Sequence, residues 1–286
     1  MCETCRRAYG VAGRAADSPW GAPAVSHGRP VAPAPSPDNP AWGAPAALGL
    51  LLASLASLFA AALCAPVVYL LYLGLSGAAI PFEVLDKATR GEVTADLVVP
   101  TVLFQGVGHV LTLAIAWAVV TDGGRRGFFE SVGWRWAERV RLPHVVGIAV
   151  ALQVFTILFS LVVRSPEDMP FTQLLESSPL AKIAVGVLAV VTAPLIEEVV
   201  FRGVLYPALA RPLGRAAAVV IVSAIFLYIH SAQYAGAVAV MVPLGLLSVT
   251  LTALRAYTGS LLPSFVLHTL FNGITVAFML LEAARP

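Results

Sequence analysis

Three charged side chains lie together inside one of the most apolar stretches of the sequence. Glu197, Glu198 and Arg202 fall among Val, Leu, Ile and Ala residues. A charged side chain at membrane depth costs at least ~2.5 kcal/mol, so charges that are kept together there indicate a function. Glu198 and Arg202 are four residues apart and share a helix face, which lets them form an ion pair, whereas Glu197 points about 100° away from Glu198 and can face the helix-bundle interior.

Two other apolar stretches each carry a histidine with a second notable side chain four residues away. Phe226 precedes His230, and Asn272 follows His268. A lone membrane histidine is more often a packed, hydrogen-bonded residue than a catalyst. Together with Glu197, however, these stretches supply a base, a proton carrier and two polarising donors, which is a nearly complete set for hydrolysis.

The composition indicates that lipid surrounds most of this chain. Of the 286 residues, 58% are hydrophobic and only 12% are charged, which is too little polar surface for an ordinary soluble domain. The net charge is only +2, and the Lys and Arg residues lie in short connections rather than in one patch, so nucleic-acid binding is not supported.

Apolar runs of the length needed to cross a bilayer occur seven times. Lipid offers no hydrogen bonds to the backbone, so each run is expected to be a helix and the fold class to be an all-α, polytopic transmembrane helical bundle. The expected spans are Ala46–Leu75, Leu97–Val120, His144–Val163, Lys182–Ala208, Ala216–His230, Ala235–Leu254 and Ser260–Leu281.

The connections between these spans differ in their number of positive charges. Twelve Lys and Arg residues fall on one side of the predicted bundle and five on the other, with Arg202 inside the fourth run. Positive charges concentrate on the cytoplasmic side. We therefore expect a multi-pass protein of the bacterial cytoplasmic (inner) membrane, with the N-terminus in the cytoplasm and the C-terminus outside.

The sequence divides into three regions. Residues 1–45 contain eight prolines between Pro19 and Pro45 and are expected to form a disordered cytoplasmic tail. Cys2 and Cys5 of this tail form a CxxC, but no second Cys/His pair lies nearby to complete a metal site. Residues 46–180 hold the first spans and an aromatic, Arg-rich stretch, Gly127–Leu142, that is expected to be a helix at the membrane surface. Residues 181–286 hold the chemistry.

The three motifs of this last region resemble those of a known family. Glu197 to Arg202 reads as EExxxR, Phe226 to His230 as FxxxH, and His268 to Asn272 as HxxxN. In this order, on successive apolar runs, they resemble the signatures of the CPBP intramembrane proteases, which include the CAAX prenyl endopeptidases and the bacteriocin-processing proteins. The resemblance covers about Ala181 to Ala277.

The resemblance implies proteolysis by an activated water molecule. Glu197 would be the general base, His230 would help to hold the water, and His268 and Asn272 would stabilise the oxyanion. Glu198, Arg202 and Phe226 would support them. No cofactor is expected. The alternative is a zinc ion held by Glu197, His230 and His268, although the chain has no HExxH motif.

Other functions and the substrate stay open at this point. A proton-coupled transporter would be expected to show internal repeats, which the sequence lacks, and a non-catalytic immunity or scaffold protein could retain the motifs as structural contacts. The expected partners are the bilayer and a membrane-associated protein or peptide. A CAAX-like peptide, a leader peptide and a C-terminal sorting anchor, as in the myxosortase branch of the family, all suit such a site.

Three further polar residues lie within or beside the spans. Gln105 and His109, four residues apart in the second span, are interpreted as a buried hydrogen-bonded pair. Arg255, at the end of the sixth, is expected to extend toward the lipid headgroups.

Overall fold

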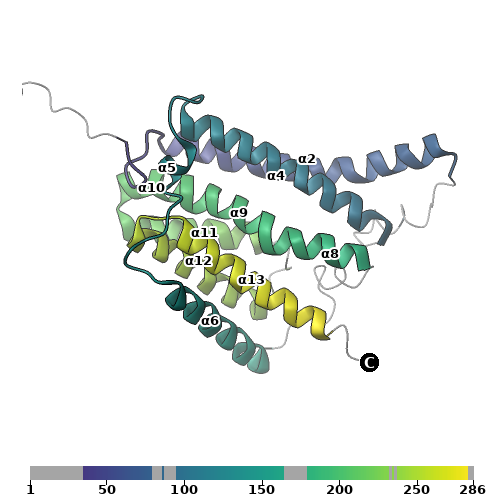
Figure 1. The fold of residues 1–286 in the computed structure, drawn as a ribbon. Coiled ribbons are helices and arrows are strands. Elements are labelled where there is room, and N and C mark those ends of the chain that lie inside the picture. The colour runs from purple at the N-terminus through teal and green to yellow at the C-terminus, as the bar shows by residue number, and fades with distance from the viewer. Residues whose placement is uncertain are drawn as a thin grey trace, which may run out of the picture. The chain divides into compact units, whose positions relative to one another are not determined.

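The computed structural model describes residues 35–78, 86, 95–163, 179–231, 234 and 237–282. This part of the chain is helical and has no strand, apart from one isolated bridge between Ser36 and Asn39. The helices are arranged as Figure 1 shows, and the label η marks a π-helix: α2 Ala44–Ser76, α4 Ala95–Thr121, α5 Phe128–Val132, α6 Leu142–Val162, α8 Pro179–Val187, η1 Leu188–Thr192, α9 Ala193–Glu197, η2 Glu198–Leu205, α10 Tyr206–Leu213, α11 Arg215–Ser231, α12 Val238–Thr258 and α13 Leu262–Glu282.

Six helices of the described residues are long and apolar enough to cross a membrane. A seventh, Arg215–Ser231, is apolar but shorter, and it coincides with the shortest of the predicted runs. The predicted all-α polytopic bundle of about seven spans is therefore confirmed. The six are Ala44–Ser76, Leu97–Thr121, Leu142–Val162, Pro179–Leu213, Val238–Thr258 and Leu262–Leu281.

The span Pro179–Leu213 is one helical path with two π-helical segments in it. These segments, η1 and η2, lie immediately before and after α9, at whose end Glu197 sits. Pro194 has no N–H to donate, so it interrupts the backbone ladder at the start of α9. Single π-helical turns inside α-helices occur often at functional sites. The two glutamates thus lie where the helix changes its winding.

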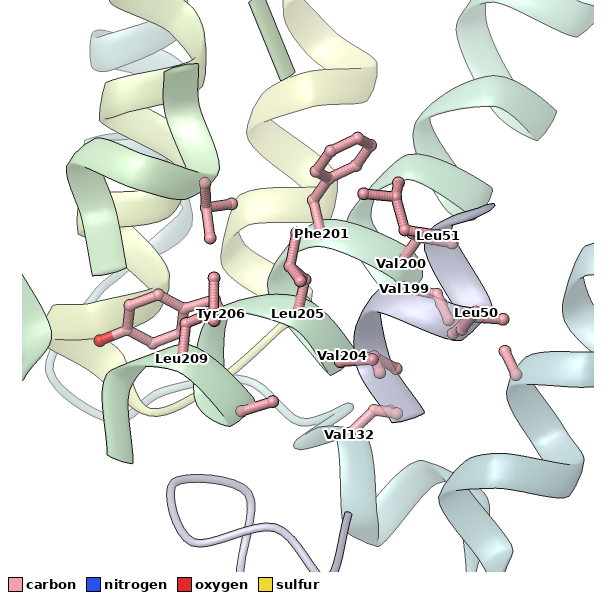
Figure 2. Close-up of a cluster of buried hydrophobic side chains, with 14 of the residues drawn as sticks. Leu50, Leu51, Val132, Val199, Val200, Phe201, Val204, Leu205, Tyr206 and Leu209 are labelled. Carbon is pink, nitrogen blue, oxygen red and sulfur yellow. The ribbon is translucent and has the colours of Figure 1, made fainter. Parts of the chain in front are cut away.

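Every residue of η2 is buried, and η2 forms the centre of the largest hydrophobic cluster. Figure 2 shows Leu50 and Leu51 of α2 and Val132 of α5 near η2 residues that include Val204 and Leu205. Close packing of this kind allows little side-chain movement. It therefore fixes the direction of the charged side chains that η2 also carries.

The predicted surface helix is much shorter in the structure. The helix α5 covers only Phe128–Val132, because Gly133 adopts φ 73° and ends it. Beyond it, the Trp134 ring lies 5.1 Å from the Phe265 ring, and the Trp136 indole donates to the carbonyl of Val140 (2.6 Å). These two aromatic residues contact other parts of the protein. Because α5 ends at Val132, the prediction of a helix through Gly127–Leu142 is wrong in its length.

The N-terminal segment described by the structure, residues 35–43, packs against the helices. Arg255 donates to Asp38 Oδ1 and to the carbonyl of Pro37, both at 2.8 Å, and the Trp42 indole donates to the carbonyl of Val204 at 3.1 Å. Arg255 is fully buried, so the expectation that it extends toward the headgroups is wrong. Residues 1–34 of the predicted tail, with Cys2 and Cys5, lie outside the described residues.

Candidate active site

The Glu197 carboxylate lies between two imidazole rings from two other helices. Its Oε1 is 3.7 Å from His230 Nε2, and its Oε2 is 3.7 Å from His268 Nε2. The Glu197 side chain keeps 24% of its surface exposed, whereas His268 keeps 3%. The structure thus brings together three of the four residues predicted to be catalytic, with Glu197 the most accessible of the three.

The helix that carries His230 also fixes the orientation of its ring. Nδ1 lies 2.8 Å from the carbonyl of Phe226, one turn earlier in α11, and the two rings stack with centroids 4.2 Å apart. A carbonyl can only accept, so Nδ1 donates to it and the neutral ring has its lone pair on Nε2. This is the nitrogen that faces Glu197.

Glu198 has two partners, not one. Its Oε1 accepts from Arg202 Nη1 at 3.1 Å, which is the predicted ion pair, and it also lies 3.1 Å from His268 Nδ1. Both members of the ion pair are fully buried. Glu198 therefore orients the second imidazole as well as neutralising Arg202. Sequence reasoning missed this contact, which joins residues 70 positions apart.

Arg202 connects this network to α12. Its Nε donates to Thr252 Oγ1 at 3.2 Å, and its Nη2 donates to the carbonyl and hydroxyl of Ser248 at 3.1 and 2.9 Å. The guanidinium also lies 4.7 Å from the centre of the Phe226 ring, on the ring's face. Phe226 thus packs between Arg202 and His230, which gives the FxxxH motif a physical role for its aromatic residue. Two hydroxyl residues spaced four apart on an apolar helix were the available sequence signal for Ser248 and Thr252.

Asn272 is held by the irregular part of the span that carries Glu197. Its Nδ2 donates to the carbonyl of Ala189 at 2.8 Å. In η1 the N–H of Ala193 bonds the carbonyl five residues earlier, and the next donor in that series belongs to Pro194, which has none. The Asn272 amide replaces that missing donor. This bond uses one of the two N–H groups of the amide.

Tyr234 lies one turn beyond His230, in the connection between α11 and α12. Its backbone N–H donates to the carbonyl of His230 at 3.3 Å. Burial, aided by the charge of Glu197, raises the pKa of the Tyr234 phenol to about 12. The phenol therefore stays protonated at neutral pH, and no motif had pointed to it.

Gln105 and His109 do not form the predicted pair. No hydrogen bond joins them, and the buried Nδ1 of His109 has no partner among the described residues. The helix that carries His109 instead packs against α8, α9 and both π-helical segments. The i, i+4 spacing alone could not show that this face of α4 is turned toward the site.

The site around Glu197 includes the three side chains that the zinc alternative requires. Within the part of the chain that the structure describes, no group of three or more His, Cys, Asp or Glu side chains is placed to hold a metal ion. The two imidazoles approach different oxygens of the carboxylate through Nε2, and Nδ1 of each is hydrogen-bonded, to the carbonyl of Phe226 and to Glu198. A hydrogen bond at the second ring nitrogen is also usual for histidines that bind a metal, so these bonds leave both mechanisms open.

Comparison with known proteins bears on the region that carries all four predicted catalytic residues. A search of curated proteins and of solved structures found no match. A family model described as Rce1-like, type II CAAX prenyl endopeptidase, matches residues 179–274. These bounds agree with the resemblance seen in the motifs and include the site's three helices. Residues 179–274 therefore belong to the Rce1-like CAAX-protease family, which supports a protease, and the apolar helices make the chain a multi-pass membrane protein.

Proposed function

We propose that this protein is a metal-free intramembrane endopeptidase in which Glu197 activates the attacking water. The observation that carries the proposal is the position of the accessible Glu197 carboxylate between two imidazole Nε2 atoms, each 3.7 Å away. That separation exceeds a direct hydrogen bond and suits groups that share a water molecule.

Each step of the reaction has a group in the site to perform it. Glu197 takes a proton from water, and the water oxygen attacks the scissile carbonyl carbon. The carbonyl oxygen becomes an oxyanion in a tetrahedral intermediate. The C–N bond then breaks, and the proton held by Glu197 passes to the leaving nitrogen. General base catalysis of this kind contributes about 10²–10⁴-fold.

The two histidines have different roles in this scheme. His230 accepts a hydrogen bond from the water through Nε2, since its Nδ1 is engaged with Phe226. His268 donates to the oxyanion through Nε2 when that nitrogen carries a proton, and the Glu198 carboxylate at Nδ1 stabilises the positive charge that results. The second N–H of Asn272 is the other donor. Preorganised donors of this kind are worth several kcal/mol.

A zinc-dependent protease is the alternative that the same residues allow. The separate approach of the two imidazoles to Oε1 and Oε2 favours the metal-free scheme. Activity after exhaustive chelation separates the two. Unchanged cleavage is expected, whereas complete loss that added zinc restores would contradict the proposal.

The family match supports one of the substrate classes considered above. A type II CAAX prenyl endopeptidase is, by its name, a protease of prenylated C-terminal CAAX sequences. We therefore take a membrane-associated peptide that ends in a prenylated cysteine, two aliphatic residues and a final residue as the substrate. The counts of Lys and Arg in the connections support a cytoplasmic N-terminus. We place the protein in the bacterial inner membrane.

The test compares wild type and E197Q in liposomes on a farnesylated peptide of this kind, with the released tripeptide measured by mass spectrometry. Wild type is expected to release it and E197Q to lose at least about 10²-fold of the rate, because the amide cannot act as a base. Glu138, which is exposed in a loop, supplies the control E138Q, with unchanged activity. Full activity in E197Q would refute catalysis by Glu197 and leave a different role for these motifs.

A further inference from the structure

The second spanning helix, α4, carries two polar side chains on the face beside the catalytic helix. Gln105 and His109 lie one turn apart, and His109 keeps only 6% of its surface exposed. Its Nδ1 is buried without a hydrogen-bond partner among the described residues. A buried polar atom in that condition is costly, so its persistence indicates that something else satisfies it.

Other polar groups of α4 are satisfied within the protein. Thr112 lies 3.1 Å from Ser57 of α2, oxygen to oxygen, and a Cβ on Gly108 would come within 3.3 Å of the carbonyl of Ser57. Residues 108 and 112 therefore define the face of α4 that contacts α2. His109 lies about 100° around the helix from Gly108 and about 60° from Thr112, so it stands at the edge of this face. No described residue of α2 bonds its Nδ1.

The His109 face is turned toward the catalytic carboxylate. The helix α4 packs against α8, α9 and both π-helical segments of the span that carries Glu197. Val98 and Val102 lie seven residues before Gln105 and His109, on the same stripe of α4, and they pack against Ala181 and Val185 of α8. The neighbouring Val110 is 66% exposed on the outside of the bundle. Helix α4 thus separates a lipid-facing side from a polar side beside the site.

The spacing of the two polar side chains fits an extended peptide. Four residues of α-helix rise about 6 Å. Backbone groups on the same side of an extended strand repeat about every 6.8 Å, which is two residues. A substrate drawn into the bundle must have its backbone N–H and C=O groups satisfied there, since lipid offers no partner.

We propose that Gln105 and His109 form a substrate-binding wall that hydrogen-bonds the main chain of the peptide beside its scissile bond. The inference rests on the proposed function, because it places the peptide next to Glu197. It adds a binding subsite outside the three motifs and outside residues 179–274, contributed by the N-terminal half of the chain. The recognition is of the peptide backbone and is independent of substrate side chains.

The first test combines H109L with backbone N-methylation of the farnesylated peptide, one position at a time, because each methyl group removes one N–H. With wild type, one methylated position is expected to raise KM about tenfold. H109L is expected to raise KM of the unmodified peptide by a similar factor and to be insensitive to methylation at that position. V110A, on the lipid side, is the matched control with unchanged KM. Additive effects of H109L and methylation at every position would overturn the inference.

A second test does not depend on the peptide being a substrate. In a background with Cys2, Cys5 and Cys64 replaced by Ser, H109C is expected to react with a water-soluble methanethiosulfonate reagent and V110C to remain unlabelled. Absence of labelling in H109C overturns the binding wall even if E197Q behaves as proposed. Conversely, if H109C is labelled while E197Q still cleaves the peptide, the proposed function is refuted. The inference that His109 lies on a water-accessible polar face of α4 would then still hold.

Discussion

The buried ion pair of Glu198 and Arg202 makes a quantitative prediction about stability. Both side chains are fully buried, 3.1 Å apart, and Arg202 also makes three hydrogen bonds to Ser248 and Thr252. The substitution R202M keeps the length of the side chain and removes its charge. It leaves Glu198 as a buried carboxylate whose Oε2 already lacks a partner among the described residues.

The magnitudes follow from that arrangement. Removing one member of a buried pair costs about 3–5 kcal/mol, because the other charge is left uncompensated. R202M and E198Q should each fall in this range. The double variant holds neither charge and loses mainly the contacts to α12, at about 0.6 kcal/mol for each interhelical hydrogen bond in a membrane protein. We therefore expect the double variant to be less destabilised than the sum of the single variants by at least about 4 kcal/mol.

The assay is equilibrium unfolding of the four proteins in mixed micelles, with helicity followed by circular dichroism. A double-mutant cycle gives the coupling free energy directly. Additive effects of the two substitutions, or a loss below about 1 kcal/mol for R202M, would show that the pair does not carry the charge balance assigned to it.

Two other predictions concern the packed N-terminal segment. D38A should lower the free energy of unfolding by about 1–3 kcal/mol, since it leaves the buried Arg255 guanidinium with only the carbonyl of Pro37 as a hydrogen-bond acceptor. D122A removes an exposed pair with Arg125 and should change the free energy of unfolding by less than about 0.5 kcal/mol. Equal effects of the two substitutions on unfolding in micelles would contradict this difference in burial. G133A should be more destabilising than G77A. Both residues have positive φ, but a Cβ on Gly133 would lie 3.1 Å from Pro37, whereas one on Gly77 would meet nothing within 4 Å. Midpoints of thermal unfolding of the two variants check this order.

The helices and the ion pair within the EExxxR motif were predictable from the sequence because both depend on local spacing. Apolar length predicts a span, and an i, i+4 interval predicts the Glu198–Arg202 pair. The winding of the fourth span was not predictable in this way. Whether a helix takes up a π-helical turn near Pro194 depends on a partner for the freed carbonyl, and that partner, Asn272, is 83 residues from Ala189.

Long-range contacts account for the rest of the differences. Arg255 was assigned to the membrane surface because its partner Asp38 is 217 residues earlier, in a segment whose composition indicated disorder. The i, i+4 spacing of Gln105 and His109 was equally compatible with a pair and with a shared open face. The second role of Glu198, as the partner of His268, required the relative positions of two spans.

The central claim is that the Glu197 carboxylate removes the proton from the attacking water. The most direct measurement is the single-turnover cleavage rate of wild type, E197D and E197Q in metal-stripped liposomes, with equal unfolding midpoints as the condition for comparison. The account predicts a measurable but reduced rate for E197D, whose carboxylate is displaced by one methylene, and a loss of at least about 10²-fold for E197Q. Cleavage by E197Q within tenfold of wild type would contradict it.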